Sequence, residues 1–407
     1  MQLLSEYRGL RKEMYVLFFG RIVTVMGSLI WPMLTLILSS KLHMSASEIA
    51  SLMLLMTIIQ LPTTIIGGKL ADCFNKRNII IICDLITVVC YLICGFIEID
   101  IWLIVLFFIG GLFANFEGPA YDTLVADLST AKDRERAYSL NYLGSNIGIV
   151  VAPTLGGFLF NNHLHLSFII SGLATLSSTI LIYIFIKDIS CEDVSNNLLY
   201  ETNEFKKSAW QVLKQRKIIL LYFFVIGIMN FIYSQFNYLM PLNLEALYQN
   251  NGALYFGTLT SLNGLVVIIF TPLFTKFLKN ITDVDKIIFG ECLITLSFCI
   301  FIFIQGNMYM YYLMMVIFTW GEIICTLGQM PYLTRRIPAS HRGRIVGMMM
   351  VFKTLFQGVS QKGMGLIIDS YSFSFAWLFI VIIGIISLIM IFVLKKWDQK
   401  YYSIFYI

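Results

Sequence analysis

Charged residues are scarce in this sequence. Asp, Glu, Lys and Arg make up 13% of its 407 residues, whereas hydrophobic residues make up 58%. An ordinary soluble domain carries about twice that share of charge, so the composition excludes a soluble globular protein. The chain is expected to be an all-α integral membrane protein.

Histidine and cysteine are also few. The four histidines fall in predicted loops, and the eight cysteines fall in predicted spans or at their cytoplasmic ends. No cysteine occupies a predicted outer loop, so no structural disulfide is expected. His163 and His165 could in principle bind a metal, but ordinary surface residues are the favoured interpretation. We therefore predict no metal site and no enzyme, and the soluble segments are too short for a sensor domain.

Long apolar runs dominate the rest of the chain. A spanning helix needs roughly 20 largely apolar residues, and the sequence contains twelve such runs. The predicted spans are residues 14–39, 46–69, 78–97, 102–128, 138–161, 166–187, 218–243, 253–277, 285–305, 308–334, 342–368 and 373–395.

Basic residues predict the orientation of these spans. Lys and Arg gather at the N-terminus, at every even-numbered connection and at the C-terminus, whereas the opposite connections hold only Lys41. By the positive-inside rule, both termini are expected to be cytoplasmic, in a bacterial cell membrane. Three basic residues remain inside predicted spans: Arg21, Lys353 and Lys362.

The chain is predicted to consist of two similar halves. The connection 188–217 separates an N-terminal six-helix bundle (1–187) from a C-terminal six-helix bundle (218–407). Its "FKKSAWQVLKQRK" portion is either a basic helix on the inner membrane surface or a solvated linker. Pro32 and Pro241 are 209 residues apart, and Pro62 and Pro272 are 210 apart. Such an offset is typical of transporters built from duplicated halves.

The connection after the second span carries a family motif. "GGKLADCFNKRN" resembles the Gly-x-Leu-Ala-Asp-Arg-x-Gly-Arg-Lys motif of the major facilitator superfamily, matched here by Gly68, Leu70, Ala71, Asp72, Lys76 and Arg77. Cys73 replaces the first Arg and Asn75 the second Gly. This resemblance implies the major facilitator fold, with twelve transmembrane helices in two pseudo-symmetric bundles.

The fifth span resembles a second signature. "GIVVAPTLGG" is similar to the Gly-x-x-x-Gly-Pro-x-x-Gly-Gly signature of drug/proton antiporters, carried here by Gly148, Pro153, Gly156 and Gly157. Antiport is therefore favoured over symport, although small residues also serve helix packing alone. "QFNYLMPLNL", "WGEIICT" and "FKTLFQG" resemble LmrP-like multidrug antiporters of that branch. The Arg-x-x-Gln-Gly pattern of many proton-coupled members is absent, because Ala114 and Glu117 occupy its positions.

Charges inside the spans are the candidate coupling residues, because a buried charge usually faces a cavity or a partner. The resemblance implies that spans 1, 4, 7 and 10 line the central cavity. Arg21 and Asp122 lie at a similar depth, roughly 10 Å from the cytoplasmic end, and are expected to pair. Glu322 and Lys353 are both near mid-membrane and are candidates for a second pair.

The fourth span holds three acids in different settings. Successive steps from Glu117 to Asp122 and to Asp127 each turn about 140° around a helix, so the acids do not share one face. The cytoplasmic gate is expected to comprise Gly68, Asp72, Lys76, Arg77, Asp127, Arg134 and Arg136. A static cluster of ions at the membrane edge is the alternative.

Glu117 and Glu322 are the candidate proton sites, because an apolar cavity disfavours the ionised carboxylate. Each could instead be a structurally paired or permanently protonated acid. Aromatic and methionine side chains suit a pliable site for organic cations, although simple helix packing is favoured for them. The candidate substrate contacts are Trp31, Met33, Phe231, Tyr233, Phe236, Asn237 and Tyr238.

We expect a monomeric transporter that exports amphipathic, cationic or neutral organic compounds in exchange for protons by alternating access. Its partners are a small-molecule substrate, protons and membrane lipids, with no nucleic acid and no cofactor beyond the proton gradient. A lipid or lysolipid translocator and a proton-coupled metabolite symporter are the alternatives of the same fold.

Overall fold

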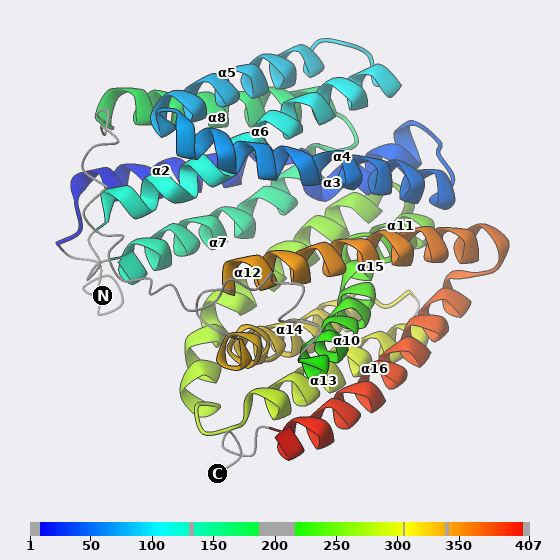
Figure 1. The fold of residues 1–407 in the computed structure, drawn as a ribbon. Helices are drawn as coiled ribbons and strands as arrows, with labels where there is room; N and C mark the ends of the chain where they lie inside the picture. The colour runs from blue at the N-terminus through cyan, green and yellow to red at the C-terminus, as the bar shows by residue number, and fades with distance from the viewer. Residues whose placement is uncertain (1–8, 130–133, 187–215, 304–305, 338–341, 402–407) are drawn as a thin grey trace. The chain divides into compact units, whose positions relative to one another are not determined.

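The computed structural model describes residues 9–129, 134–186, 216–303, 306–337 and 342–401, and within these ranges all regular structure is helical (Figure 1). The long helices are α2 (Lys12–Gly27), α4 (Ala46–Cys73), α5 (Lys76–Cys94), α6 (Ile101–Leu128), α7 (Arg134–Leu159), α8 (Leu164–Phe185), α10 (Lys217–Tyr233), α12 (Gly252–Phe277), α13 (Asp283–Phe303), α14 (Met308–Arg336), α15 (Arg342–Ser370) and α16 (Phe373–Tyr401). The predicted spans coincide with these helices, each to within a few residues at most ends.

Nine helical runs among the described residues are long and apolar enough to cross a membrane. One of them, Lys217–Phe277, contains two predicted spans. The spans predicted at 46–69 and 342–368 are the two outside these runs. The second of these is α15, whose Arg342, Arg344, Lys353 and Lys362 make it the most polar of the long helices.

The first and seventh spans are interrupted at matching positions. After α2, the chain leaves helical geometry at Ser28 and resumes as α3 (Ile30–Leu36), which contains Pro32. After α10, a 3₁₀ turn (Ser234–Phe236) leads to α11 (Leu239–Tyr248), which contains Pro241. A proline ring clashes with the carbonyl four residues earlier, and both interruptions lie at that point. The prolines that are 209 residues apart therefore break equivalent helices.

The described chain forms two compact units. Unit 1 comprises residues 1–44, 55–199 and 248–264, and unit 2 comprises 45–54, 200–247 and 265–407. Residues 45–54 and 248–264 are therefore each grouped with the unit that contains most of the other half of the chain. The central segment 187–215 lies outside the described residues.

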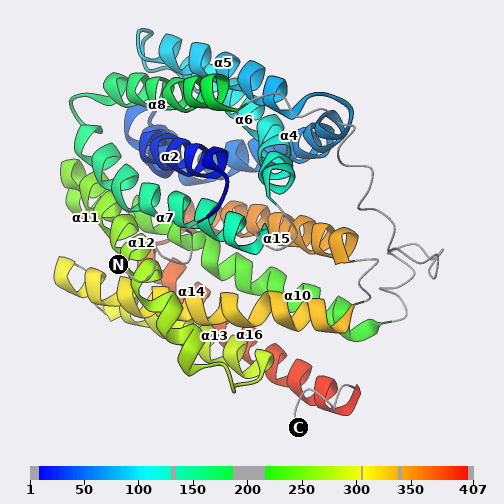
Figure 2. The ribbon, with the colours of Figure 1, turned by 90° about the vertical axis from the view of Figure 1, so that its left-hand side faces the viewer.

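Unit 1 is held together around α2, α5 and α8. Helix α8 packs against both α2 and α5, and α5 packs against α6 (Figure 2). The buried cluster at one end of these helices includes Met14, Leu17, Tyr121, Leu124 and Ile182. Its residues come from α2, α4, α5, α6, α7 and α8, so this core fixes how these helices lie against one another.

Unit 2 has an aromatic core. The Trp377 ring stacks on Phe298 and Phe301, with centroids 5.4 and 5.0 Å away and interplanar angles of 22° and 15°. Trp377 is fully buried, and its Nε1 donates a hydrogen bond of 3.0 Å to Asn243. Aromatic pairs of this kind add about 0.5 to 1.5 kcal/mol each beyond area burial. The core therefore joins α11, α13 and α16.

A buried ion pair joins the ends of α14 and α16. Arg336 and Asp398 are 2% and 0% exposed, with Nη2 and Oδ2 2.5 Å apart and a second bond of 2.7 Å from Nε to Oδ1. The guanidinium also lies over the Tyr332 ring, 3.8 Å from its centroid. The pair is thus bidentate and enclosed, a geometry in which loss of one partner leaves a buried charge.

We expect Asp398→Ala to destabilise the chain by about 3 to 5 kcal/mol, because it strands the Arg336 charge. Thermal unfolding of purified protein in detergent, followed by size exclusion, measures the change. Glu13→Ala is the control, since Glu13 pairs with the largely exposed Arg11 at 3.4 Å and its loss should cost under about 1 kcal/mol. Equal melting temperatures for both variants would contradict this account of the pair.

Candidate functional site

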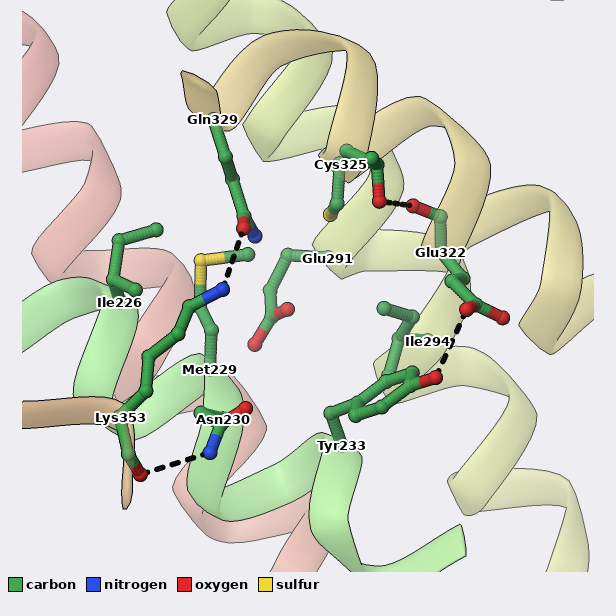
Figure 3. Close-up of a pocket in the computed structure, with 11 residues that line it drawn as sticks. Ile226, Met229, Asn230, Tyr233, Glu291, Ile294, Glu322, Cys325, Gln329 and Lys353 are labelled. Carbon is green, nitrogen blue, oxygen red and sulfur yellow. Dashed lines mark hydrogen bonds between the residues drawn. The ribbon is translucent and has the colours of Figure 1, made fainter. Parts of the chain in front are cut away.

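A polar cavity lies within unit 2. It has a volume of about 230 Å³ and is enclosed by α10, α13, α14 and α15 (Figure 3). Its lining combines two carboxyls, one amine, two amides and several apolar groups: Ile226, Met229, Asn230, Tyr233, Glu291, Ile294, Glu322, Cys325, Thr326, Gln329 and Lys353. Such a site can hold a small polar or charged group inside an apolar bundle.

Glu322 and Lys353 both line this cavity, as predicted for residues near mid-membrane, but each has another partner. Glu322 Oε1 accepts a hydrogen bond of 2.9 Å from the Tyr233 hydroxyl, whose ring stacks on Phe318. Lys353 Nζ donates to Gln329 Oε1 at 3.3 Å. Figure 3 shows the two groups on opposite sides of the cavity. The expected direct pair is therefore replaced by two separate polar contacts, because each charged group finds a neutral partner on its own side.

The sequence interpretation missed the third charged residue of the cavity, Glu291. Its side chain is fully buried, and neither carboxyl oxygen has a hydrogen-bond partner. The Ser387 hydroxyl of α16 lies beside it without a hydrogen bond of normal geometry. An acid inside the span predicted at 285–305 was the available signal, since such residues are rare in spans and usually functional.

A smaller cavity of about 110 Å³ lies within unit 1. Its lining includes Trp31, Asp84, Glu117, Ser171 and Thr175. Asp84 is 5% exposed and accepts a hydrogen bond of 2.6 Å from the Thr179 hydroxyl, while its carboxyl is also within hydrogen-bonding reach of Glu117. Glu117 therefore faces a cavity, as predicted, but its immediate neighbour is Asp84, an acid that sequence reasoning also passed over.

A shared sequence pattern relates the two missed acids. "CDLIT" (83–87) recurs 208 residues later as "ECLIT" (291–295), with the acid moved by one position. Thr179 and Ser387, the hydroxyl residues beside Asp84 and Glu291, are also 208 residues apart. The offset matches the one that relates the two halves, so each unit has an acid on its third helix facing a hydroxyl on its sixth.

The predicted partnership of Arg21 and Asp122 does not form. Arg21 Nε donates to the Ser145 hydroxyl at 2.9 Å, and its guanidinium lies 5.5 Å from the Tyr121 ring centroid. Asp122 is exposed, with the Arg21 charge close enough to act on it electrostatically. A hydroxyl of α7 therefore takes the place of the carboxylate, since α2 packs against α7.

Part of the predicted gate is an ion pair. Lys76 Nζ and Asp127 Oδ2 are 2.8 Å apart, which joins the start of α5 to the end of α6. Arg77 points elsewhere, donating a bond of 2.7 Å to the Tyr183 carbonyl at the end of α8. The side chains at Gly68, Asp72, Arg134 and Arg136 lie outside the described residues.

The glycines of α7 permit close helix contacts. A Cβ atom at Gly148 would lie 2.6 Å from Val25 Cβ, and one at Gly156 would lie 2.7 Å from the Leu29 carbonyl oxygen. On the opposite side, a Cβ atom at Gly157 would lie 2.5 Å from the Ala253 carbonyl oxygen. Pro153 contacts Gly257 just as closely. The signature residues therefore pack α7 against the first span and against α12, which agrees with the packing interpretation.

The predicted substrate contacts fall into two groups. Trp31 and Tyr233 line the cavities of unit 1 and unit 2 respectively. Met33, Phe236 and Tyr238 are instead buried in helix packing, at 1%, 4% and 0% exposure, and line neither cavity. Phe231 and Asn237 are half-buried and exposed and also line neither. Packing thus accounts for the buried three, as the alternative interpretation stated.

Comparison with known proteins decides the family. The model of the Major Facilitator Superfamily matches residues 16–361. The chain belongs to this superfamily. It is accordingly a multi-pass membrane transporter and not an enzyme.

Its relatives are bacterial transporters of more than one cargo. The chain is 21% identical over 364 residues to a Na⁺, Li⁺, K⁺/H⁺ antiporter of Planococcus maritimus, covering 81% of this chain and 83% of the relative. It is 25% identical over 215 residues to the quinolone resistance protein NorA of Staphylococcus aureus, covering 52% and 55%. The family therefore includes antiporters of inorganic cations and multidrug resistance proteins among the relatives of this chain.

Solved structures confirm the fold. A peptide transporter bound to alafosfalin matches with a TM-score of 0.78 at 15% identity, covering 98% of both chains. The nucleoside transporter NupG matches with a TM-score of 0.75 at 11% identity, covering 93% of this chain and 99% of NupG. At these identities the likeness extends to the fold alone, which is the major facilitator fold predicted from the sequence.

The Lys76–Asp127 pair gives a charge-exchange prediction. Lys76→Asp or Asp127→Lys alone places like charges together in a partly buried site, so each should lower stability by about 1 to 2 kcal/mol. The double variant should recover most of that loss, because it restores an ion pair. Melting temperatures of the four proteins in detergent test this. A double variant whose loss equals the sum of the two single losses would show that the pair contributes no stability.

Proposed function

We propose that this chain is a proton-coupled antiporter that exports amphipathic, cationic or neutral organic compounds by alternating access. The observation that carries the proposal is the polar cavity of unit 2. It places two carboxyls and aromatic Tyr233 around a space of about 230 Å³ within an apolar helical unit. Carboxyls can exchange a proton for a cation, and an aromatic ring attracts a cation through its face.

Glu322 is the proposed contact for the substrate's positive charge. Its carboxyl holds a bond from Tyr233 through one oxygen, and it projects into the cavity from α14. The family relationship supports antiport, since its relatives include multidrug resistance proteins and a cation/H⁺ antiporter. In the proposal, the chain works as a monomer in the cell membrane, with both termini cytoplasmic and no cofactor beyond the proton gradient.

The ion pair of Lys76 and Asp127 is the proposed gate contact of unit 1. It joins the ends of α5 and α6 at the side that the positive-inside rule assigns to the cytoplasm. A contact of 2.8 Å between partly exposed groups can form and break at modest cost. It therefore suits an element that rearranges between inward-open and outward-open states.

A second candidate is antiport of an inorganic monovalent cation. The relative that matches 81% of this chain has that activity in its name, and carboxyl and amide oxygens are suitable ligands for hard cations. The lining of the unit 2 cavity supplies both kinds of oxygen, from Glu291, Glu322, Asn230 and Gln329. A test of function must therefore separate organic from inorganic cations.

Inverted vesicles with an acidic interior provide that test. Addition of ethidium should release protons, seen as recovery of acridine orange fluorescence, and ethidium uptake should stop when an ionophore collapses the gradient. Glu322→Gln should weaken ethidium binding and lower proton-driven uptake by about 5- to 150-fold, because it removes the proposed contact for the positive charge. Glu98→Gln, at an exposed acid in a connection, should leave uptake unchanged.

The same vesicles distinguish the alternatives. Fluorescence recovery with NaCl, LiCl or KCl but not with ethidium would favour the inorganic cation antiporter. Gradient-independent movement of a labelled lysolipid in proteoliposomes would favour a lipid translocator. Ethidium uptake that is equal with and without the gradient would contradict proton coupling.

A further inference from the structure

Four buried polar atoms on neighbouring residues of unit 2 have no hydrogen-bond partner within the described part of the chain. They are the two carboxyl oxygens of Glu291 and the hydroxyl oxygens of Thr295 and Ser387. Thr295 follows Glu291 by four residues and so lies on the same face of α13, and Ser387 of α16 lies beside Glu291. Buried polar groups are normally satisfied, so this cluster requires a chemical explanation.

Glu291 is not tied to a permanent structural role. Two other carboxyls of the same unit form ion pairs: Asp283 pairs with Arg335 at 3.0 Å, and Asp285 pairs with Lys395 at 2.6 Å. Those two acids precede Glu291 on the same helix. An ionised carboxylate buried without such a partner would cost several kcal/mol. The fully buried Glu291 is therefore in its neutral, protonated form while no cation is beside it.

The other groups around the cavity make that proton exchangeable. The described titratable side chains that line the cavity with Glu291 come from α10, α14 and α15, and they are Tyr233, Glu322, Cys325 and Lys353. From α16, the neighbouring group is the hydroxyl of Ser387. With Lys353 as ammonium, Glu322 ionised and Glu291 protonated, the cavity is electrically neutral. Entry of one monovalent cation makes it positive, and loss of the Glu291 proton makes it neutral again.

We propose that Glu291 binds a transported proton in the unit 2 cavity and releases it when a cationic group enters beside Glu322. This inference rests on the proposed function and assigns its proton to a residue outside every motif of the sequence. The O–H bond of the Glu291 carboxyl breaks, the proton passes to water in the opened cavity, and the new carboxylate faces the incoming cation. Departure of the cation reverses the exchange.

Unit 1 also places an acid beside a hydroxyl group, but there the carboxyl accepts a hydrogen bond. There Asp84 occupies the position equivalent to Glu291 within one residue, and its carboxyl is bonded by Thr179 at 2.6 Å. Glu117 lies close enough to it for the two carboxyls to interact electrostatically. The cavity of about 110 Å³ is half the volume of that in unit 2. The repeat thus places an acid at an equivalent position in each unit. Of the two acids, Glu291 is the one without a hydrogen-bond partner among the described residues.

Carbodiimide labelling tests proton binding directly, because N,N′-dicyclohexylcarbodiimide reacts with protonated carboxyls in apolar sites. The purified full chain in detergent is labelled between pH 6 and pH 9, and the peptide covering Asp283–Phe303 is analysed by mass spectrometry. Glu291 should be labelled at pH 6 at least about tenfold more than Asp285, and its labelling should fall several-fold towards pH 9. Asp285 is the control on the same helix, since it is partly exposed and pairs with Lys395 at 2.6 Å.

Variants separate the proton site from a structural role. Glu291→Gln should lose the label at position 291 and proton-driven ethidium uptake, while ethidium exchange without a gradient persists. Glu291→Asp keeps a carboxyl and should retain pH-dependent labelling. A wild-type Glu291 that stays unlabelled at pH 6 would overturn the proposal, as would labelling that is constant from pH 6 to pH 9. Full gradient dependence in Glu291→Gln would also overturn it.

The two proposals can fail separately. If the wild-type chain moves no cation against a proton gradient, the proposed function fails, yet pH-dependent labelling would still show that Glu291 binds and releases a proton. If ethidium uptake depends on the gradient in both the wild type and Glu291→Gln, the proposed function holds and the proton site lies elsewhere.

Discussion

The cost of burying an ionisable group among apolar helices governs most of this structure. Such a group must be paired, hydrogen-bonded or neutral, and the chain uses all three solutions. Arg336 and Asp398 are enclosed as a bidentate pair. Arg21 and Lys353 use neutral partners, a serine hydroxyl and a glutamine amide. Glu291 remains without a partner and can be accommodated only as a neutral acid, which separates it from the ions that hold helices together.

In each unit an ion pair joins the ends of the third and fourth helices, but the positive and negative residues are exchanged. In unit 1, Lys76 at the start of the third helix pairs with Asp127 at the end of the fourth. In unit 2, Asp283 and Arg335 join the equivalent ends with the signs exchanged. The positions are related by about the same 208-residue offset. What the two halves share is therefore an ion pair between these helix ends. Which of the two helices carries the positive charge differs between the halves.

The fold was largely predictable from the sequence, and the reasons are physical. Apolar runs of about 20 residues predict the spans, and Pro32 and Pro241 break two equivalent helices because a proline ring clashes with an earlier carbonyl. The polar α15 was still recognisable as a span, because its charges are few. Helix pairing was less predictable, since the partners of Arg21 and Lys353 depend on which neutral groups neighbouring helices present.

The candidate site was only partly predictable. Glu117 and Glu322 were candidates because the family resemblance places spans 4 and 10 at the cavity, and Lys353 was a candidate because it is a charge inside a predicted span. Asp84 and Glu291 were missed because their spans carry no family motif, although an acid within an apolar run was itself a signal. The candidates Met33, Phe236 and Tyr238 rest on a less specific signal. Large apolar side chains suit a cavity and a packed core equally well, and here they lie in the core.

The two cavities differ in a way that bears on coupling. In unit 1, Asp84 accepts a hydrogen bond from Thr179 and lies near Glu117 beside a space of about 110 Å³, which leaves little room for a further charged group. In unit 2, Glu291 and Glu322 are set apart across about 230 Å³, and each can respond to a cation between them. A duplicated acid position thus has two different surroundings. The separation of the carboxyls, more than their number, makes unit 2 the half suited to exchange a proton for a substrate charge.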